Sequence, residues 1–172
     1  YVVRDPEGVR LVRPKDILDD WVNFYSYKNN QSTAYYCHAK GIPEILKQIA
    51  VLRIPKEIRY SLTLHAGAWL VAPHAVVHEV HIYADGDQDQ QKILSFWKEH
   101  LKLEQAERGA NFYLLKPYYH RSAFYGMRLI KGLNVVSDLQ LYLDLKHYPL
   151  RGEEQAEFLF EKRLKSKLRQ GD

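Results

Sequence analysis

The chain has 172 residues, of which 46% are hydrophobic and 13% aromatic, which suffices for one folded domain and excludes a largely disordered chain. Its net charge of +4, from 25 lysines and arginines against 21 acidic residues, is too small for a dedicated nucleic-acid-binding arm. No apolar run approaches the roughly 20 residues that span a bilayer, and no signal-peptide pattern is present, so we expect a cytoplasmic protein with no membrane contact. The single cysteine, Cys37, excludes an internal disulfide and fits a reducing compartment.

The first half of the chain alternates helical and extended patterns. A helix is predicted from Pro14, because Leu18, Trp21, Val22 and Tyr25 recur at helical spacing. The remaining predicted elements are a strand at 33–38, a helix from 41 to about 55, a strand at 58–64, a short helix at 66–70 and a strand at 76–83 whose Val76, Val80 and Ile82 share a face.

The second half continues the alternation. We predict a turn at 85–87, a helix at 89–100, strands at 101–105, 111–115 and 123–130, and helices at 138–147 and 153–168. Ser137 and Gln140 fit a capping box, in which each side chain satisfies a backbone amide of the other residue. Five or six helices and five or six strands predict an α/β (α+β) fold with a mixed, partly antiparallel sheet.

The chain starts at Tyr1 and not at a methionine, so we expect that an N-terminal portion is missing. Residues 1–13 would then be a connector or the end of that missing module. Residues 14–169 contain no repeat, linker or low-complexity tract, and they are predicted to form a single α/β domain.

The motifs of common catalytic sites are absent from the sequence, so we predict no catalytic residue, no metal ligand and no cofactor. His74, His78 and His81 lie near each other in sequence, but residues 78 and 81 of a strand would point to opposite faces. Asp85, Asp87 and Asp89 lack the glutamate that closes a calcium loop, and they are interpreted as turn and cap residues.

One segment has the letters of a metal-dependent nuclease, Asp144-Leu145-Lys146. It falls inside a predicted helix, where a spacing of two residues turns the acid and the lysine apart. We therefore interpret it as a solvated helix face.

Tyrosine occurs 13 times, including the pairs Tyr35-Tyr36 and Tyr118-Tyr119. The second pair, beside Lys116, His120, Arg121 and Arg128, could form an aromatic and basic binding surface, but we favour tyrosines that line an amphipathic sheet. The basic run that ends at Arg169 is interpreted as a solvated helix end, with phosphate contact as the alternative. The candidate nucleic-acid or partner contacts are Arg128, Arg151, Lys162, Arg163 and Lys165.

Several segments carry a resemblance to a known family. They are residues 136–145 (VSDLQLYLDL), 151–157 (RGEEQAE), 60–63 (YSLT) with Ala66, Ala68 and Pro73, and 111–117 (NFYLLKP). Over about residues 14–165 the chain resembles the AbiEi antitoxins and transcriptional regulators of type IV, abortive-infection toxin–antitoxin systems. It departs from that pattern at 65–68 (HAGA), where a Thr-Gly pair is expected.

The resemblance implies a non-enzymatic antitoxin-like domain that counters a nucleotidyltransferase-like toxin without needing a stable complex with it. It also implies a missing N-terminal winged helix-turn-helix that binds the promoter DNA of the operon. Two alternatives stay open: a nuclease-like or nucleotidyl-modifying enzyme, and a nucleic-acid-binding module that uses the basic C-terminal helix.

Overall fold

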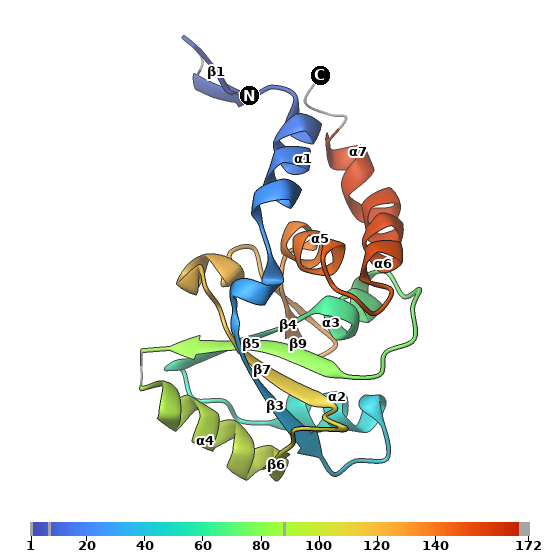
Figure 1. Ribbon diagram of the computed structural model, residues 1–172. Helices are drawn as coiled ribbons and strands as arrows, with labels where there is room; N and C mark the ends of the chain where they lie inside the picture. Colours follow the sequence, from blue (N-terminus) through green and yellow to red (C-terminus); the bar gives the residue numbers. More distant parts are fainter. Residues whose placement is uncertain (1, 7, 88, 169–172) are drawn as a thin grey trace.

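The computed structural model describes residues 2–6, 8–87 and 89–168 (Figure 1). Tyr1, at the start of the chain, and Arg169, at the end of the basic run, lie outside the described residues. No helix within the described ranges is long and apolar enough to cross a membrane.

A seven-stranded mixed sheet, counted over the described residues, forms the centre of the molecule, in the order β6-β3-β7-β5-β4-β9-β8. The β5–β7 and β4–β9 pairs are parallel, and the other neighbours are antiparallel. This confirms the predicted mixed, partly antiparallel sheet, with more strands than expected. The strands are β3 (Gln31–Cys37), β4 (Ile58–Thr63), β5 (Val80–Gly86), β6 (Leu103–Gln105), β7 (Phe112–Lys116), β8 (Arg128–Ile130) and β9 (Leu133–Val135).

Helices cover both faces of this sheet. On one face lie α2 (Ile42–Val51) and α4 (Gln90–Leu101), and on the other lie α3 (Leu64–Val71) and α5 (Asp138–Lys146). Figure 1 shows α1 (Pro14–Phe24) and α6 (Gly152–Leu159) beside α5, away from the sheet. A π-helical turn, Phe160–Leu164, continues α6 into α7 (Lys165–Leu168), so the predicted C-terminal helix is confirmed.

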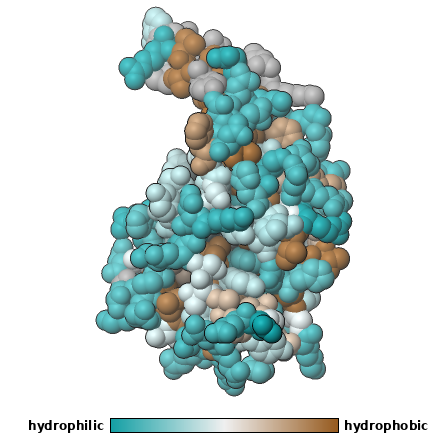
Figure 2. Space-filling view, in the orientation of Figure 1, coloured by the Kyte–Doolittle hydropathy of each residue, from teal (hydrophilic) through white to brown (hydrophobic). Residues whose placement is uncertain are grey.

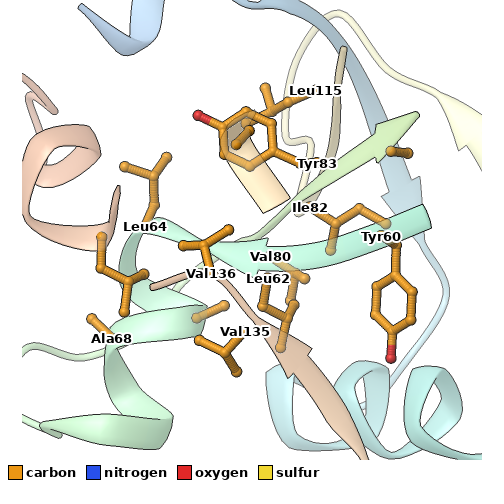
Figure 3. Packing of buried hydrophobic residues seen from close by; sticks show 14 of the residues in the cluster. Tyr60, Leu62, Leu64, Ala68, Val80, Ile82, Tyr83, Leu115, Val135 and Val136 are labelled. Atoms are coloured by element: carbon orange, nitrogen blue, oxygen red, sulfur yellow. The ribbon is translucent and has the colours of Figure 1, made fainter. Parts of the chain in front are cut away.

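The alternation of side chains along β5 explains how the core divides. Val80 and Ile82 are fully buried in the apolar cluster with Leu62 (Figure 3). The intervening His81 and Tyr83 project to the opposite face, as the two-residue period of a strand requires. That second face, which α5 covers, therefore receives polar side chains from the central strands.

Three sequence predictions about strands and turns are wrong. Residues 123–130 do not form one strand, because a 3-10 turn, η2 (His120–Phe124), and Gly126 with a φ of 70° precede β8. The predicted turn at 85–87 is also wrong, since β5 extends to Gly86. Val76 lies outside β5 and is 65% exposed, because that strand begins only at Val80.

Residues before α1 form a separate two-stranded hairpin, β1 (Val2–Asp5) paired antiparallel with β2 (Gly8–Leu11). The hairpin stands beyond the first turn of α1, at the end of the molecule that is remote from the sheet (Figure 1). Val2, Val3 and Leu11 are exposed on it, and Figure 2 shows hydrophobic atoms at this end of an otherwise largely hydrophilic face. Residues 2–5 and 8–11 therefore form regular structure.

Candidate functional site around helix α5

Helix α5 begins at the predicted cap. The Ser137 hydroxyl accepts a hydrogen bond of 3.1 Å from the backbone amide of Gln140, which confirms the first half of the capping box. The reciprocal half is wrong. The Gln140 side-chain amide donates to the Tyr25 hydroxyl and to Asp144 Oδ1, each at 2.9 Å, because a buried carboxylate one turn further along the helix needs the donor.

Asp144 is the centre of a buried polar network that joins α1, β4, β5 and α5. It is fully buried, and it accepts hydrogen bonds from Tyr25, Thr63, Gln140 and Tyr83, the last at 2.9 Å. Each donor comes from a different point of the chain: just after α1, the end of β4, the first turn of α5 and the middle of β5. The network therefore fixes how α5 sits on the sheet.

Among the described residues this network contains no cation, and this sets the protonation behaviour of Asp144. Burial raises the pKa of Asp144 to about 6, although hydrogen bonds from Thr63, Tyr25, Gln140 and Tyr83 oppose the rise. Burial and the neighbouring carboxylate also raise the pKa of the Tyr25 and Tyr83 hydroxyls, so both remain protonated donors.

The interpretation of Asp144 and Lys146 as a solvated helix face is wrong, although the two side chains do point apart. Lys146 lies on the opposite side of α5, 16% exposed, with its Nζ 3.1 Å from Glu153 and 2.9 Å from Glu157. Asp144 and Lys146 therefore make separate structural contacts.

The first turn of α5 carries a different carboxylate, Asp138, which is 3% exposed and surrounded by cations. Arg128 from β8 binds its Oδ1, while Arg163 Nε and Lys167 Nζ lie 3.4 Å and 3.2 Å from its Oδ2. We call these three residues the cation cluster. The three positive charges of the cation cluster exceed the single negative charge of Asp138, so this group of side chains at the N-terminal end of α5 carries a net positive charge.

The cation cluster reverses the effect of burial on Asp138. Burial alone would raise the pKa of this carboxyl group, but the hydrogen bond and charge of Arg128, with the charges of Arg163 and Lys167, lower it below its usual value. Asp138 is accordingly ionised at neutral pH.

The structure brings together only two of the five predicted contact residues, Arg128 and Arg163. Lys165 forms a local ion pair of 2.7 Å with Glu161, and the Lys162 ammonium lies 5.7 Å from the centre of the Phe158 ring. The prediction that the basic run is a solvated helix end therefore holds for Lys162 and Lys165 and not for Arg163.

Arg151 lies in the segment that connects α5 to α6. It has a φ of 55° and binds Glu154 through two nitrogens, at 2.8 Å and 2.6 Å. At the next residue, Gly152, a Cβ would lie 2.4 Å from the Leu145 carbonyl oxygen. Only glycine permits this close approach, which gives a packing reason for the Arg-Gly step in the resemblance.

The two tyrosine pairs behave differently. Tyr35 is buried and Tyr36 is 39% exposed on β3, as expected for an amphipathic sheet. Tyr118 and Tyr119 precede η2, where they are 59% and 48% exposed, so for this pair the sheet interpretation is wrong. Tyr125, at 86%, extends the exposed aromatic surface.

A cavity of about 290 Å³ lies beneath these tyrosines, between α1, η2 and α5. Tyr25 and Gln140 line it, so it adjoins the Asp144 network. Tyr25 and Tyr119 lie nearly parallel, with an angle of 24° between their planes and ring centres 6.0 Å apart. We call this cavity the aromatic pocket; its other lining residues include Trp21, Tyr125, Ser137 and Leu143.

The three histidines named above do not converge. His74 binds Glu154 at 2.8 Å, His81 is buried with its ring stacked on Tyr113, and His78 precedes β5. The argument from opposite strand faces is therefore wrong for His78, which is outside the strand. Among the described residues no group of three or more histidine, cysteine or acidic side chains could hold a metal ion.

Sequence reasoning missed the partners of both carboxylates. A signal was present for Asp144, since leucines flank it on both sides and Gln140 stands one helical turn before it. Thr63, Tyr83 and Lys167 carry no such signal, because their approach to α5 depends on the packing of strands and helices that are distant in sequence.

The family described as "Transcriptional regulator, AbiEi antitoxin, Type IV TA system" matches residues 10–165. The matched range contains both carboxylates of α5 and the aromatic pocket. Comparisons with curated proteins and with solved structures found no match. The chain therefore belongs to the AbiEi antitoxin family of transcriptional regulators in type IV toxin–antitoxin systems.

Proposed function

We propose that this chain is a non-catalytic antitoxin domain, which acts in the cytoplasm against a nucleotidyltransferase-like toxin. Family membership supports an antitoxin with a cognate toxin. The chain counters this toxin without catalysis and without a stable complex between the two proteins.

One observation carries the non-catalytic part: the best acidic candidate in the sequence is enclosed as a structural group. Asp144 has no exposed surface, and its oxygens accept hydrogen bonds from the side chains of Tyr25, Thr63, Tyr83 and Gln140. A carboxylate that activates water or holds a catalytic metal must reach the substrate, which Asp144 does not.

Neutralisation of the toxin tests the proposal directly. The chain is co-expressed with the nucleotidyltransferase-like toxin encoded beside it, and growth is followed after the toxin is induced. We expect the wild-type chain and Asp144→Asn to restore growth equally, because the substitution keeps the shape of the buried group. Growth arrest in cells that contain soluble, folded wild-type chain contradicts the antitoxin assignment. If the wild-type chain restores growth but folded Asp144→Asn does not, the result contradicts the absence of catalysis.

The full-length product of the gene is the positive control. Rescue by that product and not by the chain would show that antitoxicity requires residues outside this domain, which contradicts the proposal for the domain. Affinity purification of the chain from rescued cells is expected to recover no stoichiometric toxin. Recovery of a stable complex would contradict an action without lasting contact.

A second function, contact with DNA, is favoured by the cation cluster at Asp138. Three cations around one carboxylate leave net positive charge available to phosphates. We propose that this charge supplements promoter recognition by a winged-helix module additional to this domain.

Salt dependence of binding to the operon promoter measures this contribution. Arg163→Ala is expected to reduce the slope of log affinity against log salt by about one unit, as for the loss of one phosphate contact. Lys165→Ala is the matched control, because Lys165 pairs one-to-one with Glu161 and lies outside the cation cluster. Equal slopes for Arg163→Ala and the wild type would contradict a role of the cluster in DNA binding.

A further inference from the structure

Three properties of the aromatic pocket and its surroundings restrict the chemistry of a ligand. Its walls are aromatic, its floor is polar, and the helix α5 that lines it carries the cation cluster at its first turn.

The walls select a flat, conjugated ligand. Trp21, Tyr119 and Tyr125 line the pocket and are 46%, 48% and 86% exposed. Large aromatic side chains that remain exposed around a cavity are available to stack on a planar ring. A volume of about 290 Å³ is at the small end of ligand pockets and fits one ring system better than a peptide segment.

The floor selects a ring that carries both hydrogen-bond donors and acceptors. The Gln140 amide nitrogen is held by Tyr25 and Asp144, which fixes the orientation of the side chain. Its Oε1 has no hydrogen bond to another described residue and remains an acceptor. Ser137 Oγ accepts a hydrogen bond from the backbone N–H of Gln140, so its own hydroxyl proton remains to be donated. An adjacent acceptor and donor match the polar edge of a nucleobase.

The first turn of α5 favours an anionic ligand. Ser137 and Leu139 line the pocket, and Asp138, with its three cations, stands between them in the chain. Successive helical residues project about 100° apart, so the cation cluster lies on the face of α5 next to the pocket and not in the pocket wall. The N–H groups of the cluster can donate hydrogen bonds to a phosphate that extends from a ring bound in the pocket.

We propose that the aromatic pocket binds a nucleotide, with the base between the aromatic side chains above Gln140 and the phosphate toward Arg128, Arg163 and Lys167. This site does not depend on the proposed antitoxin function. The same chemistry is offered by a free nucleotide and by an unpaired nucleotide of a single strand, and the test separates these two sources.

Another cavity shows why the combination matters. It has about 370 Å³ and is lined by Trp69, Pro73, His74 and apolar residues of α2 and the segment before β5. Its lining contains no amide or hydroxyl side chain, and no group of cations like that at Asp138 adjoins it among the described residues. This second cavity is larger than the aromatic pocket, but its chemistry selects no particular ligand.

The test is titration calorimetry with AMP, GMP, CMP and UMP on the wild-type chain. We expect measurable binding of at least one of these nucleotides and weaker binding of the corresponding nucleoside. Trp21→Ala and Tyr125→Ala should each reduce the affinity at least about fivefold, which corresponds to the loss of one stacking contact. Arg163→Ala should remove most of the advantage of the nucleotide over the nucleoside.

Matched controls separate binding from damage to the fold. Phe24→Ala removes an aromatic ring that is 84% exposed on the same helix as Trp21 but outside the pocket, and it should leave the affinity unchanged. Lys162→Ala, next to Arg163 but turned to Phe158, should also leave it unchanged. No binding of any nucleotide or single strand at millimolar concentration overturns the proposal, and so does equal weakening by Phe24→Ala and Trp21→Ala.

Single-stranded homopolymers distinguish the source of the nucleotide. If an oligonucleotide of the preferred base binds at least tenfold more tightly than the mononucleotide, and Tyr125→Ala weakens both, the pocket holds an unpaired nucleotide of a strand. Equal affinities support a free nucleotide. Binding of the oligonucleotide that Trp21→Ala and Tyr125→Ala do not weaken would overturn the pocket as the site.

Discussion

Helix α5 holds one buried carboxylate in its first turn and another near its last, and the two are compensated in different ways. Asp138 is surrounded by guanidinium and ammonium groups, whereas Asp144 is surrounded by hydroxyl and amide donors. The pKa of Asp138 is accordingly lowered, and the pKa of Asp144 is raised to about 6. Two aspartates six residues apart thus have opposite electrostatic environments.

This difference indicates that the Asp138 end of α5 is a contact surface, whereas the Asp144 end holds the helix against the sheet. Arg163 and Lys167 are 41% and 62% exposed, so they can exchange Asp138 for a phosphate without leaving water. The donors to Asp144 are largely buried and belong to four segments of the fold, so their rearrangement would loosen the packing of α5 on the sheet. The aromatic pocket lies between these two ends, with Ser137 and Gln140 in its wall.

The largest difference is expected on deleting the two carboxylates. Asp144→Ala leaves buried donors without an acceptor and should reduce the free energy of unfolding by about 3–5 kcal/mol. Asp138→Ala should cost only about 1–2 kcal/mol, because its three cationic partners are partly exposed to water. Urea denaturation at pH 5 measures both, and equal losses would show that the two ends are not different in kind.

The dependence on pH should also differ, in sign as well as in range. The raised pKa of Asp144 means that the folded state holds its proton more tightly than the unfolded state, so this group makes the wild type less stable as pH rises from about 4 to 7. Asp144→Asn removes this ionisable group and with it the loss of stability at higher pH. Its stability relative to the wild type should increase by about 2 kcal/mol between pH 4 and 7.

Denaturation series at several pH values measure this change. Asp138→Asn is the control, since its difference from the wild type should stay constant over the same interval. A constant difference for Asp144→Asn would contradict the raised pKa.

The sequence predicts the fold class and most helices well, because their apolar spacing is local information. The first half of the Ser137 cap is predicted for the same reason. Residues 128–130 form only the last part of the predicted strand 123–130, and the strand at 133–135 is not predicted, because strands of three residues depend on their partners more than on their own residues.

The candidate site is less predictable than the fold. Arg128 and Arg163 could be named from charge alone, but their meeting at Asp138 joins β8 to the C-terminal helix and follows only from tertiary packing. For Asp144, the sequence suggests the wrong environment. Its neighbour Lys146 suggests an exposed, charged segment, whereas its true partners are uncharged side chains far away in sequence.

Salt should affect only the first turn of α5. Asp138→Asn is expected to cost about 1–2 kcal/mol at low ionic strength and clearly less in 1 M salt, because half-exposed charges are screened. The effect of Asp144→Ala should be nearly independent of salt, since its partners are uncharged. Because the pKa of Asp138 is lowered, its contribution is present above about pH 4 and is lost as pH falls through the lowered value.

The smallest effects compare two lysines of one helix, Lys165 and Lys167. Each pairs with an acid, but the partner of Lys165 is the exposed Glu161 and the partner of Lys167 is the buried Asp138. Both alanine substitutions should change the free energy of unfolding by less than about 1 kcal/mol. The distinguishing measurement is therefore the titration of Asp138 by NMR: Lys167→Ala should raise its pKa, and Lys165→Ala should not. If neither substitution changes that titration, Lys167 does not belong to the cation cluster, and two arginines alone hold Asp138.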